Sequence, residues 1–212
     1  MKKTVAMRIA EEISRRIATG VLHPGQHLVE TTLAEEFQTS RAPIREALLM
    51  LERDRLVKRV PHHGVMVRSF TKDEIHDLYD VIYRLEEIAM ERAVAQEPPL
   101  DLASIEENLR QQYEAVERQD IHSFYELNEE FHDILFSLAG NKVLLDVYRS
   151  LRRSARPFRI LSMAQGDNLI HSYTEHYKQV EALRSRDPGA GKQAIREQER
   201  RALRSLDFLF LK

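Results

Sequence analysis

Apolar residues recur at intervals of three and four along most of this chain, the spacing that places them on one face of an α-helix. Near the start, the pattern changes once to short β-rich runs and then returns to helical spacing. The elements predicted there are helices over 4–19 and 30–37, a helix that begins at Ser40, and strands over 56–60 and 65–68 joined by the loop 61–64. Three helices followed by a hairpin are typical of a winged helix-turn-helix.

A second, purely helical region begins at Thr71. Thr71 and Glu74 have the spacing of a capping box, a strong signal for a helix start. The helices predicted after it cover 71–96, 101–118, 120–139, 142–164, 168–186 and 189–211. The second of these is expected to bury Ile105, Leu109, Tyr113 and Val116. The predicted fold class is therefore mostly α, with an N-terminal winged helix-turn-helix over 1–70 and a C-terminal all-α helical bundle over 71–212.

The helix that begins at Ser40 carries the most informative chemistry. Ser40 is expected to cap it by accepting a backbone N–H bond, and Pro43 falls in the first turn, where its missing N–H loses no helical bond. Arg41 and Arg45 share one face, four residues apart. Guanidinium groups bind guanine edges and phosphates in bidentate fashion. The helix is therefore predicted to enter the major groove of DNA.

Charge is divided unevenly along the chain. Residues 1–70 hold 12 Lys or Arg and 8 Asp or Glu, a net charge of +4, whereas the remainder carries −6. The positive part is the one predicted to meet phosphate. The chain has no cysteine, which excludes a disulfide framework and a thiolate zinc site. It has no apolar run of membrane-spanning length and no signal-peptide pattern, so we expect a cytoplasmic protein without a membrane partner.

Several motifs lie at fixed distances from one another in the first domain. They are Gly20-x-x-x-Pro24-Gly25-x-x-Leu28-x-Glu30, Leu33-Ala34, Ser40-Arg41-x-Pro43-Ile44-Arg45-Glu46-Ala47-Leu48 and His63-Gly64. Together they resemble the GntR family of bacterial transcription regulators. By position, the resemblance implies that DNA is contacted by the start of the recognition helix and by the wing tip. These contacts would come from Thr39, Ser40, Arg41, Ala42, Pro43, Arg45, His63 and Gly64.

The second domain has its own set of motifs. They are Leu85-Glu86, Phe131-His132, Ala139-Gly140-Asn141, Glu175-His176 and Ala182-Leu183 with Asp187. They resemble the effector-binding FCD domain of the FadR branch, and the count of six helices resembles its VanR subgroup. The resemblance implies a homodimer that binds operator DNA under the control of a small-molecule effector, a metabolite held in the bundle. It implies no enzymatic activity.

In many FCD domains an aspartate and three histidines bind a divalent metal. The matching positions here are Asn128, His132, His176 and Gln198, so two of the family's ligands are replaced by uncharged amides. The resemblance thus implies at most weak binding of Zn²⁺ or Ni²⁺ at His132 and His176. In a second interpretation, the same four residues form a metal-free cluster that hydrogen-bonds an effector directly. In a third interpretation, Asn128 and His132 are buried polar residues that hydrogen-bond each other across one helical turn and bind no ligand.

The predicted helix over 142–164 carries arginines that offer positive charge to an anionic effector. Relatives often carry an arginine on the first bundle helix, where Ile82 stands here. Arg152, Arg156 and Arg159 instead form a stripe on the later helix, and Arg152 and Arg156 are assigned to the effector pocket. For any single one of these arginines, however, a solvated basic face is the favoured interpretation.

The sequence thus favours a ligand-responsive repressor that binds a near-palindromic operator as a homodimer. Two alternatives stay open at this point. The first is an effector-independent DNA-binding protein whose pocket has decayed along with the metal ligands. The second is a metal-dependent helical enzyme built on His132 and His176, although the chain offers it no paired catalytic carboxylates.

Overall fold

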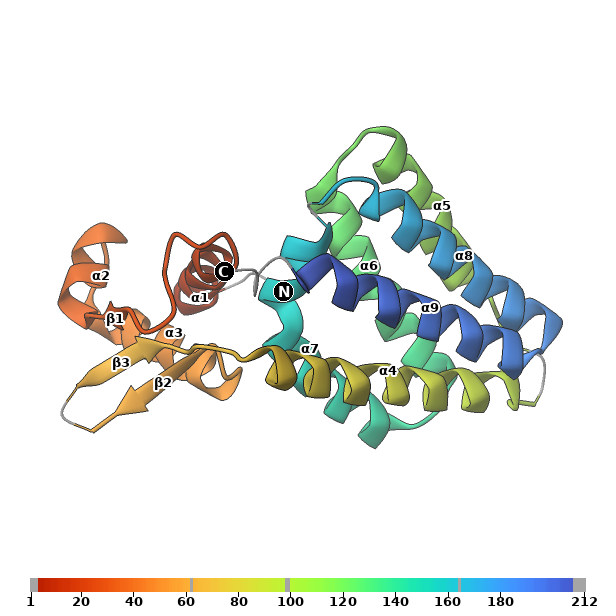
Figure 1. Cartoon of the computed structure of the whole chain (residues 1–212), viewed down its shortest axis with the longest axis horizontal. Coiled ribbons are helices and arrows are strands. Elements are labelled where there is room, and N and C mark those ends of the chain that lie inside the picture. The colour runs from red at the N-terminus through yellow and green to blue at the C-terminus, as the bar shows by residue number, and fades with distance from the viewer. Residues whose placement is uncertain (1–3, 62, 98–99, 164, 208–212) are drawn as a thin grey trace.

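A computed structural model describes residues 4–61, 63–97, 100–163 and 165–207. Figure 1 shows two domains: a small one with a sheet and a larger helical bundle. The first contains α1 (Val5–Ala18), β1 (His27–Leu28), α2 (Glu30–Glu36), α3 (Arg41–Arg53), β2 (Val57–Val60) and β3 (Gly64–Val67). The second contains α4 (Lys72–Val94), α5 (Ala103–Glu117), α6 (Ile121–Leu138), α7 (Lys142–Met163), α8 (Asn168–Ser185) and α9 (Pro188–Leu206).

The small domain is a three-helix unit with an antiparallel sheet in the order β1-β3-β2. β2 and β3 form the predicted hairpin, and buried and more exposed residues alternate along β3. The two-residue strand β1 was not predicted, because two residues are too few to show a periodicity. It pairs with β3, with Leu28 opposite Val65, and so ties the wing back to the core. Ile13, Ile44 and Leu48 are fully buried in that core.

The bundle begins as predicted, with a capping box: the Glu74 backbone N–H donates to the Thr71 hydroxyl, and the Thr71 backbone N–H donates to the Glu74 carboxylate. α5 differs from its prediction: Tyr113 is 45% exposed, and Asn108 and Gln112 are buried instead. The buried face takes these amides because hydrogen bonds satisfy them, as described below. The predicted last helix extends to 211, and its part beyond 207 lies outside the described residues.

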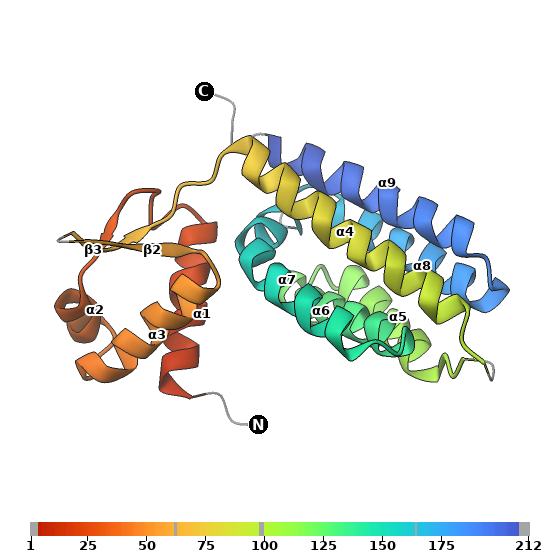
Figure 2. The same ribbon diagram turned by 90° about the horizontal axis from the view of Figure 1, so that it is seen from below.

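Contacts beside the connecting segment join the two domains. Phe70, which precedes α4, packs edge-on against Phe158 of α7, with ring centroids 5.0 Å apart. Arg153 of α7 donates from Nε to the Asp54 carboxylate, 3.0 Å away, at the C-terminal cap of α3. Figure 2 shows α1 and α7 facing each other between the domains. α7 is therefore the element of the bundle through which the small domain is contacted.

Candidate functional site

The outer face of α3 carries the two arginines that the sequence singles out. Ile44, Ala47 and Leu48 are fully buried behind it. Arg41 and Arg45 lie on the opposite face, with side chains that are 54% and 56% exposed. The start of the helix is thus held from behind, while its guanidinium groups face solvent, as entry into a major groove requires.

The N-terminus of α3 differs in one detail from its prediction. Ser40 occupies the N-cap position with extended backbone, but its side chain accepts no capping hydrogen bond. Pro43 lies in the first turn, as expected. Ser40 and Ala42 are exposed, and Thr39 and Pro43 are half-buried. The prediction that the Ser40 side chain caps the helix is therefore wrong. The first-turn N–H groups are left for an external acceptor such as a phosphate.

Both arginines of α3 contact one carboxylate. Arg45 donates from Nε to Oε2 of Glu30 at 2.7 Å, and Arg41 donates from Nη2 to the same oxygen at 3.3 Å. The hydrogen bond from Arg45 holds the pKa of Glu30, which opens α2, below its ordinary value. Exposed pairs of this kind contribute little stability, so a duplex can replace Glu30 as the partner. Sequence reasoning gave Glu30 no such role because the contact depends on the angle between α2 and α3.

The wing tip is fixed by a second contact that the sequence did not predict. His27 of β1 donates from Nδ1 to the backbone carbonyl of His63, 2.9 Å away. Both His63 and Gly64 are exposed, and Gly64 has a φ of 76°, a left-handed conformation that favours glycine. His62, in the predicted wing loop, lies outside the described residues. His27 therefore ties the wing tip to strand β1 at the edge of the sheet.

The four positions of the predicted effector site lie together in the middle of the bundle. Asn128 and His132 of α6 and His176 of α8 are fully buried, and Gln198 of α9 is 3% exposed. The rings of His132 and His176 are 5.1 Å apart and perpendicular. Asn128 and His132 do not hydrogen-bond one another, because within the described part of the chain neither amide atom of Asn128 and neither ring nitrogen of His132 has a hydrogen-bond partner. The interpretation in which they simply pair with each other is therefore wrong.

His176 belongs to a directed chain of buried hydrogen bonds. Gln179 donates to Oε1 of Gln198 at 3.0 Å, and the Gln198 amide nitrogen lies 3.2 Å from His176 Nε2. Because an amide NH₂ can only donate, His176 Nε2 accepts and His176 Nδ1 carries the proton. That proton is donated to Gln112 at 2.7 Å, and Gln112 donates in turn to Asn108 at 2.7 Å. Every member of this chain is uncharged.

These buried hydrogen bonds determine whether the site can bind a metal ion. A divalent ion needs the free lone pair of each imidazole. At His176 one ring nitrogen is protonated and the other accepts from the Gln198 amide, so no lone pair is free. Asn128 and Gln198 add no negative charge, and the described residues contain no group of three His, Cys, Asp or Glu placed to hold a metal. The residues present do not fit the metal that the family resemblance implies.

A buried carboxyl group stands on the other side of His132. Glu86 Oε1 lies 3.3 Å from His132 Nδ1 and accepts a hydrogen bond from the Tyr148 hydroxyl at 2.8 Å. Burial raises the pKa of Glu86 to about 7 and lowers the pKa of His132 well below its ordinary value. His132 is therefore neutral at physiological pH, and Glu86 is only partly ionised. The sequence placed Glu86 in the Leu85-Glu86 motif of the family but did not predict a role for its carboxyl group.

The arginine stripe on α7 is not a uniform solvated face. Arg152 and Arg159 are 6% and 8% exposed, so the interpretation as a basic surface is wrong for both. Arg152 donates from Nε to Glu129 at 2.8 Å and lies over the Tyr148 ring. Its alkyl stem is covered because α7 packs against α4 and α6 on this side. Arg156, assigned to the effector pocket from the sequence, instead points away from the histidines, as described below.

A small cavity adjoins the buried cluster. Its volume is about 20 Å³, which is room for about one water molecule. Its walls come from α4, α6, α7, α8 and α9 and include Tyr79, Tyr83, Asn128, Arg159, Gln198 and Arg201. Arg201 is satisfied there by Glu175, with two hydrogen bonds of 2.7 Å.

Comparison with known proteins agrees with both halves of this architecture. The family model "Bacterial regulatory proteins, gntR family" matches residues 5–67, and the model "FCD domain" matches residues 77–200. The chain is a GntR-family transcription regulator with an FCD domain.

Individual relatives of this GntR regulator are similar over nearly their whole length. An uncharacterized helix-turn-helix regulator of Bacillus subtilis, YdhC, is 26% identical over 89% of this chain and 85% of its own. The gluconate operon repressor of the same organism is 27% identical over 88% of this chain and 78% of its own. The structure of Escherichia coli McbR superimposes with a TM-score of 0.76 and 22% identity, covering 99% of this chain and all of that one.

Family membership removes one alternative. The matched families and relatives are transcription regulators, so the GntR regulator is not the metal-dependent enzyme that the two histidines left open. Within the described residues, no helix is long and apolar enough to cross a membrane.

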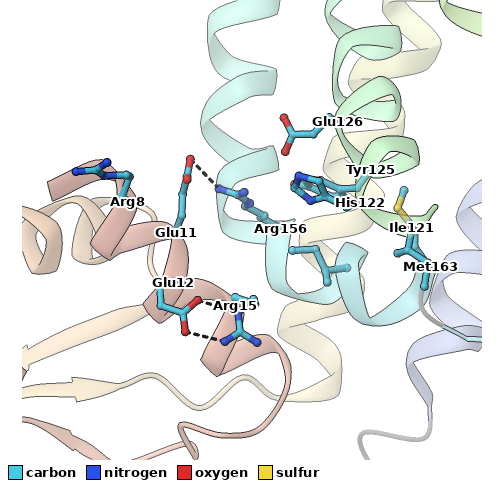
Figure 3. Close-up of a pocket in the computed structure, with 11 residues that line it drawn as sticks. Arg8, Glu11, Glu12, Arg15, Ile121, His122, Tyr125, Glu126, Arg156 and Met163 are labelled. Atoms are coloured by element: carbon cyan, nitrogen blue, oxygen red, sulfur yellow. Dashed lines mark hydrogen bonds and ion pairs between the residues drawn. The ribbon is translucent and has the colours of Figure 1, made fainter. Parts of the chain in front are cut away.

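A larger cleft lies between the two domains of the regulator. It has a volume of about 440 Å³ and is lined by α1 on one side and by α6 and α7 on the other. Figure 3 shows Glu11 of α1 reaching toward Arg156 of α7, and the two side chains are 4.0 Å apart. The Arg156 guanidinium lies 5.6 Å from the centre of the Tyr125 ring. Arg156 is therefore a residue of the domain interface, apart from the histidine cluster.

Proposed function

We propose that this regulator represses transcription by binding a near-palindromic operator as a homodimer, and that a small metabolite in the FCD domain sets its affinity for DNA. Because its target is chromosomal DNA, it would act in the cytoplasm. The observation that carries the proposal is the pair Arg41 and Arg45, exposed side by side on a helix whose other face is buried. The gluconate operon repressor, similar over most of the chain, supports repression as the mode of action.

A homodimer is supported by an apolar strip on the bundle. Val81 and Ile88 of α4 are 46% and 42% exposed, and Val147 of the adjacent α7 is 46% exposed. The half-buried Leu85 and Leu151 belong to the same two helices. A second copy related by a twofold axis would cover these residues on both subunits. It would also supply the second recognition helix that a palindrome needs, about 34 Å from the first.

Effector control is supported by the position of α7. Arg159 lines the cavity in the bundle, while the preceding Phe158 packs on Phe70 in the connecting segment. Pro157 lies between this pair and Arg156 and removes one hydrogen bond from the interior of the helix. A ligand that displaces α7 at the cavity therefore changes contacts to the small domain. It acts on DNA binding only as far as it prefers one placement of that domain over another.

A second candidate function is an effector-independent DNA-binding protein. The small cavity volume of about 20 Å³ favours it, because a filled interior leaves no room for a metabolite. The unpartnered buried atoms of Asn128 and His132 favour effector binding instead, since a decayed pocket has no reason to keep them.

Selection of DNA from a genomic library tests the proposal. Purified regulator should enrich fragments that share an inverted repeat with half-site centres about one helical turn apart. The double variant R41A/R45A should enrich none of them, whereas the variant Arg92→Ala, a change in the bundle, should select the same set. Enrichment of no common sequence at low salt, or of the same sequences by R41A/R45A, would contradict the proposed DNA-reading face.

A further inference from the structure

The centre of the bundle holds a buried cation, Arg159, that makes only a long ion pair and no hydrogen bond with the residues that the structure describes. The Arg159 side chain is 9% exposed, and within the described ranges its nearest carboxylate oxygen is Glu129 Oε1, 3.8 Å from Nε. No hydrogen bond to its guanidinium is present among those residues. Arg201, on the wall of the same cavity, has a bidentate carboxylate partner in Glu175. Buried guanidinium groups are normally paired, so the state of Arg159 requires an explanation.

Other unpartnered polar groups line the same cavity as Arg159. The hydroxyl of Tyr79 and both amide atoms of Asn128 are buried and have no hydrogen-bond partner among the residues that the structure describes. One helical turn from Asn128, neither ring nitrogen of His132 has one. Most of these groups donate hydrogen bonds: the guanidinium N–H groups, a phenol and an amide NH₂. An arrangement of buried donors around a cation is complementary to an oxygen-bearing anion.

We propose that this site binds a small oxyanion directly, without a metal, and that Arg159 supplies the positive charge. This inference rests on the proposed function and names the ligand class of the effector site. Two observations carry it. The Gln198 amide occupies the lone pair that His176 would offer to a metal, and Arg159 brings to the cavity a cation that makes no hydrogen bond within the described residues and whose nearest carboxylate oxygen is 3.8 Å away. Asn128 and Tyr79 provide further donors to the ligand oxygens.

The cavity opens when such an anion binds. At about 20 Å³ it accommodates about one water molecule, so a ligand of several heavy atoms must displace side chains or part of α7. Arg159 lies two residues after Pro157, where the helix has lost a hydrogen bond. Movement there is passed to Phe158 and its contact with Phe70 between the domains. Ligand binding and the placement of the DNA-binding domain are thereby coupled.

Thermal unfolding tests the anion site on protein dialysed against EDTA. The probes are acetate, succinate, citrate and inorganic phosphate, with succinamide as a neutral control. An anion at about 100 times its Kd should raise the Tm of the wild type by about 5–10 °C. Succinamide should give no shift. R159Q should lose the shift and R159K should keep part of it, while both fold and bind operator DNA. The carboxylates and phosphate distinguish the two sources of an oxyanion.

Metal titration tests the other half of the inference. The wild type should bind no stoichiometric Co²⁺ or Zn²⁺. The double variant N128D/Q198H should gain about one Co²⁺ per chain, seen in the visible absorption spectrum, because it restores a carboxylate and an imidazole.

Four results would overturn the inference: stoichiometric metal in the wild type, an unchanged anion response in R159Q, no shift of the wild type with any of the four anions, or failure of N128D/Q198H to gain metal while folded. Operator binding by the wild type is read separately, so failure here leaves the DNA-binding proposal standing.

Discussion

Replacing Arg45 with alanine gives the sharpest test of the DNA-reading face. A bidentate contact to a base is worth about 1–3 kcal/mol. A homodimer loses two such contacts, so we expect about 2–6 kcal/mol, or roughly a 30-fold to 20,000-fold rise in Kd for operator DNA. Arg53 lies in the last turn of the same helix and is 65% exposed, so R53A is a matched control with little expected effect.

The assay is a fluorescence-anisotropy titration of labelled operator at several salt concentrations. If Arg45 contacts a base, the dependence of log K on log salt should be unchanged in R45A. If it contacts a phosphate, the slope should fall by about 0.9 per contact, or about 1.8 for the dimer. The two kinds of contact are thus separated by the same measurement.

Glu30 complicates the magnitude and needs its own variant. Removal of Arg45 takes away the 2.7 Å bond and leaves the Glu30 carboxylate with only Arg41 at 3.3 Å. Part of the loss in R45A then comes from an exposed negative charge near DNA phosphates. The double variant E30Q/R45A should recover that part. An R45A affinity within twofold of wild type at every salt concentration would refute the assigned role of Arg45.

Three further predictions concern stability and assembly. Burial raises the pKa of Glu86 from 4.5 to about 7 in the folded protein, so the folded state holds a proton that the unfolded state has already released. As the pH rises from 4.5 to 7, the wild type should therefore lose roughly 3 kcal/mol of unfolding free energy relative to E86Q. Urea unfolding at pH 4.5, 6 and 8 measures this loss, and parallel pH profiles of the two proteins would contradict it. G191A should destabilise by about 1–3 kcal/mol, because an added Cβ would meet the Met90 side chain at 2.6 Å; an unchanged Tm would show that Met90 yields freely. V81E should dissociate the dimer while the far-UV spectrum stays unchanged, and sedimentation velocity showing an intact dimer would exclude the α4–α7 strip as the interface.

Local rules were enough to predict most of the helices and the wing. Helical spacing and the capping box at Thr71 are properties of neighbouring residues, and the structure confirms α4 as starting there. The helix predicted over 120–139 ends at Leu138 in the structure, and Gly140 follows it with a φ of 64°. These features depend on contacts between residues at most four positions apart, so they can be predicted from the sequence directly.

The same local rules failed where a side chain chooses between two surroundings. Tyr113 and Gln112 are adjacent, and apolar spacing favoured Tyr113 for the core, yet Gln112 is buried because it accepts from His176 and donates to Asn108. Arg152 was assigned to the effector pocket, with a solvated face as the favoured interpretation for any single arginine of its stripe, but it is buried and donates to Glu129 of α6. Neither partner is close in sequence, so no periodicity could show it.

The order of residues alone was sufficient to predict the family, the fold class of both domains and the exposed pair Arg41 and Arg45, because motifs and spacings are properties of the linear sequence. Only the packing of α6, α7, α8 and α9 decided the nature of the buried site. It brought the Gln198 amide to His176 and left Arg159 with its nearest carboxylate oxygen, that of Glu129, 3.8 Å away. The physical reason is that a hydrogen bond or charge acts over a few ångströms of space, and folding alone determines which distant residues come that close.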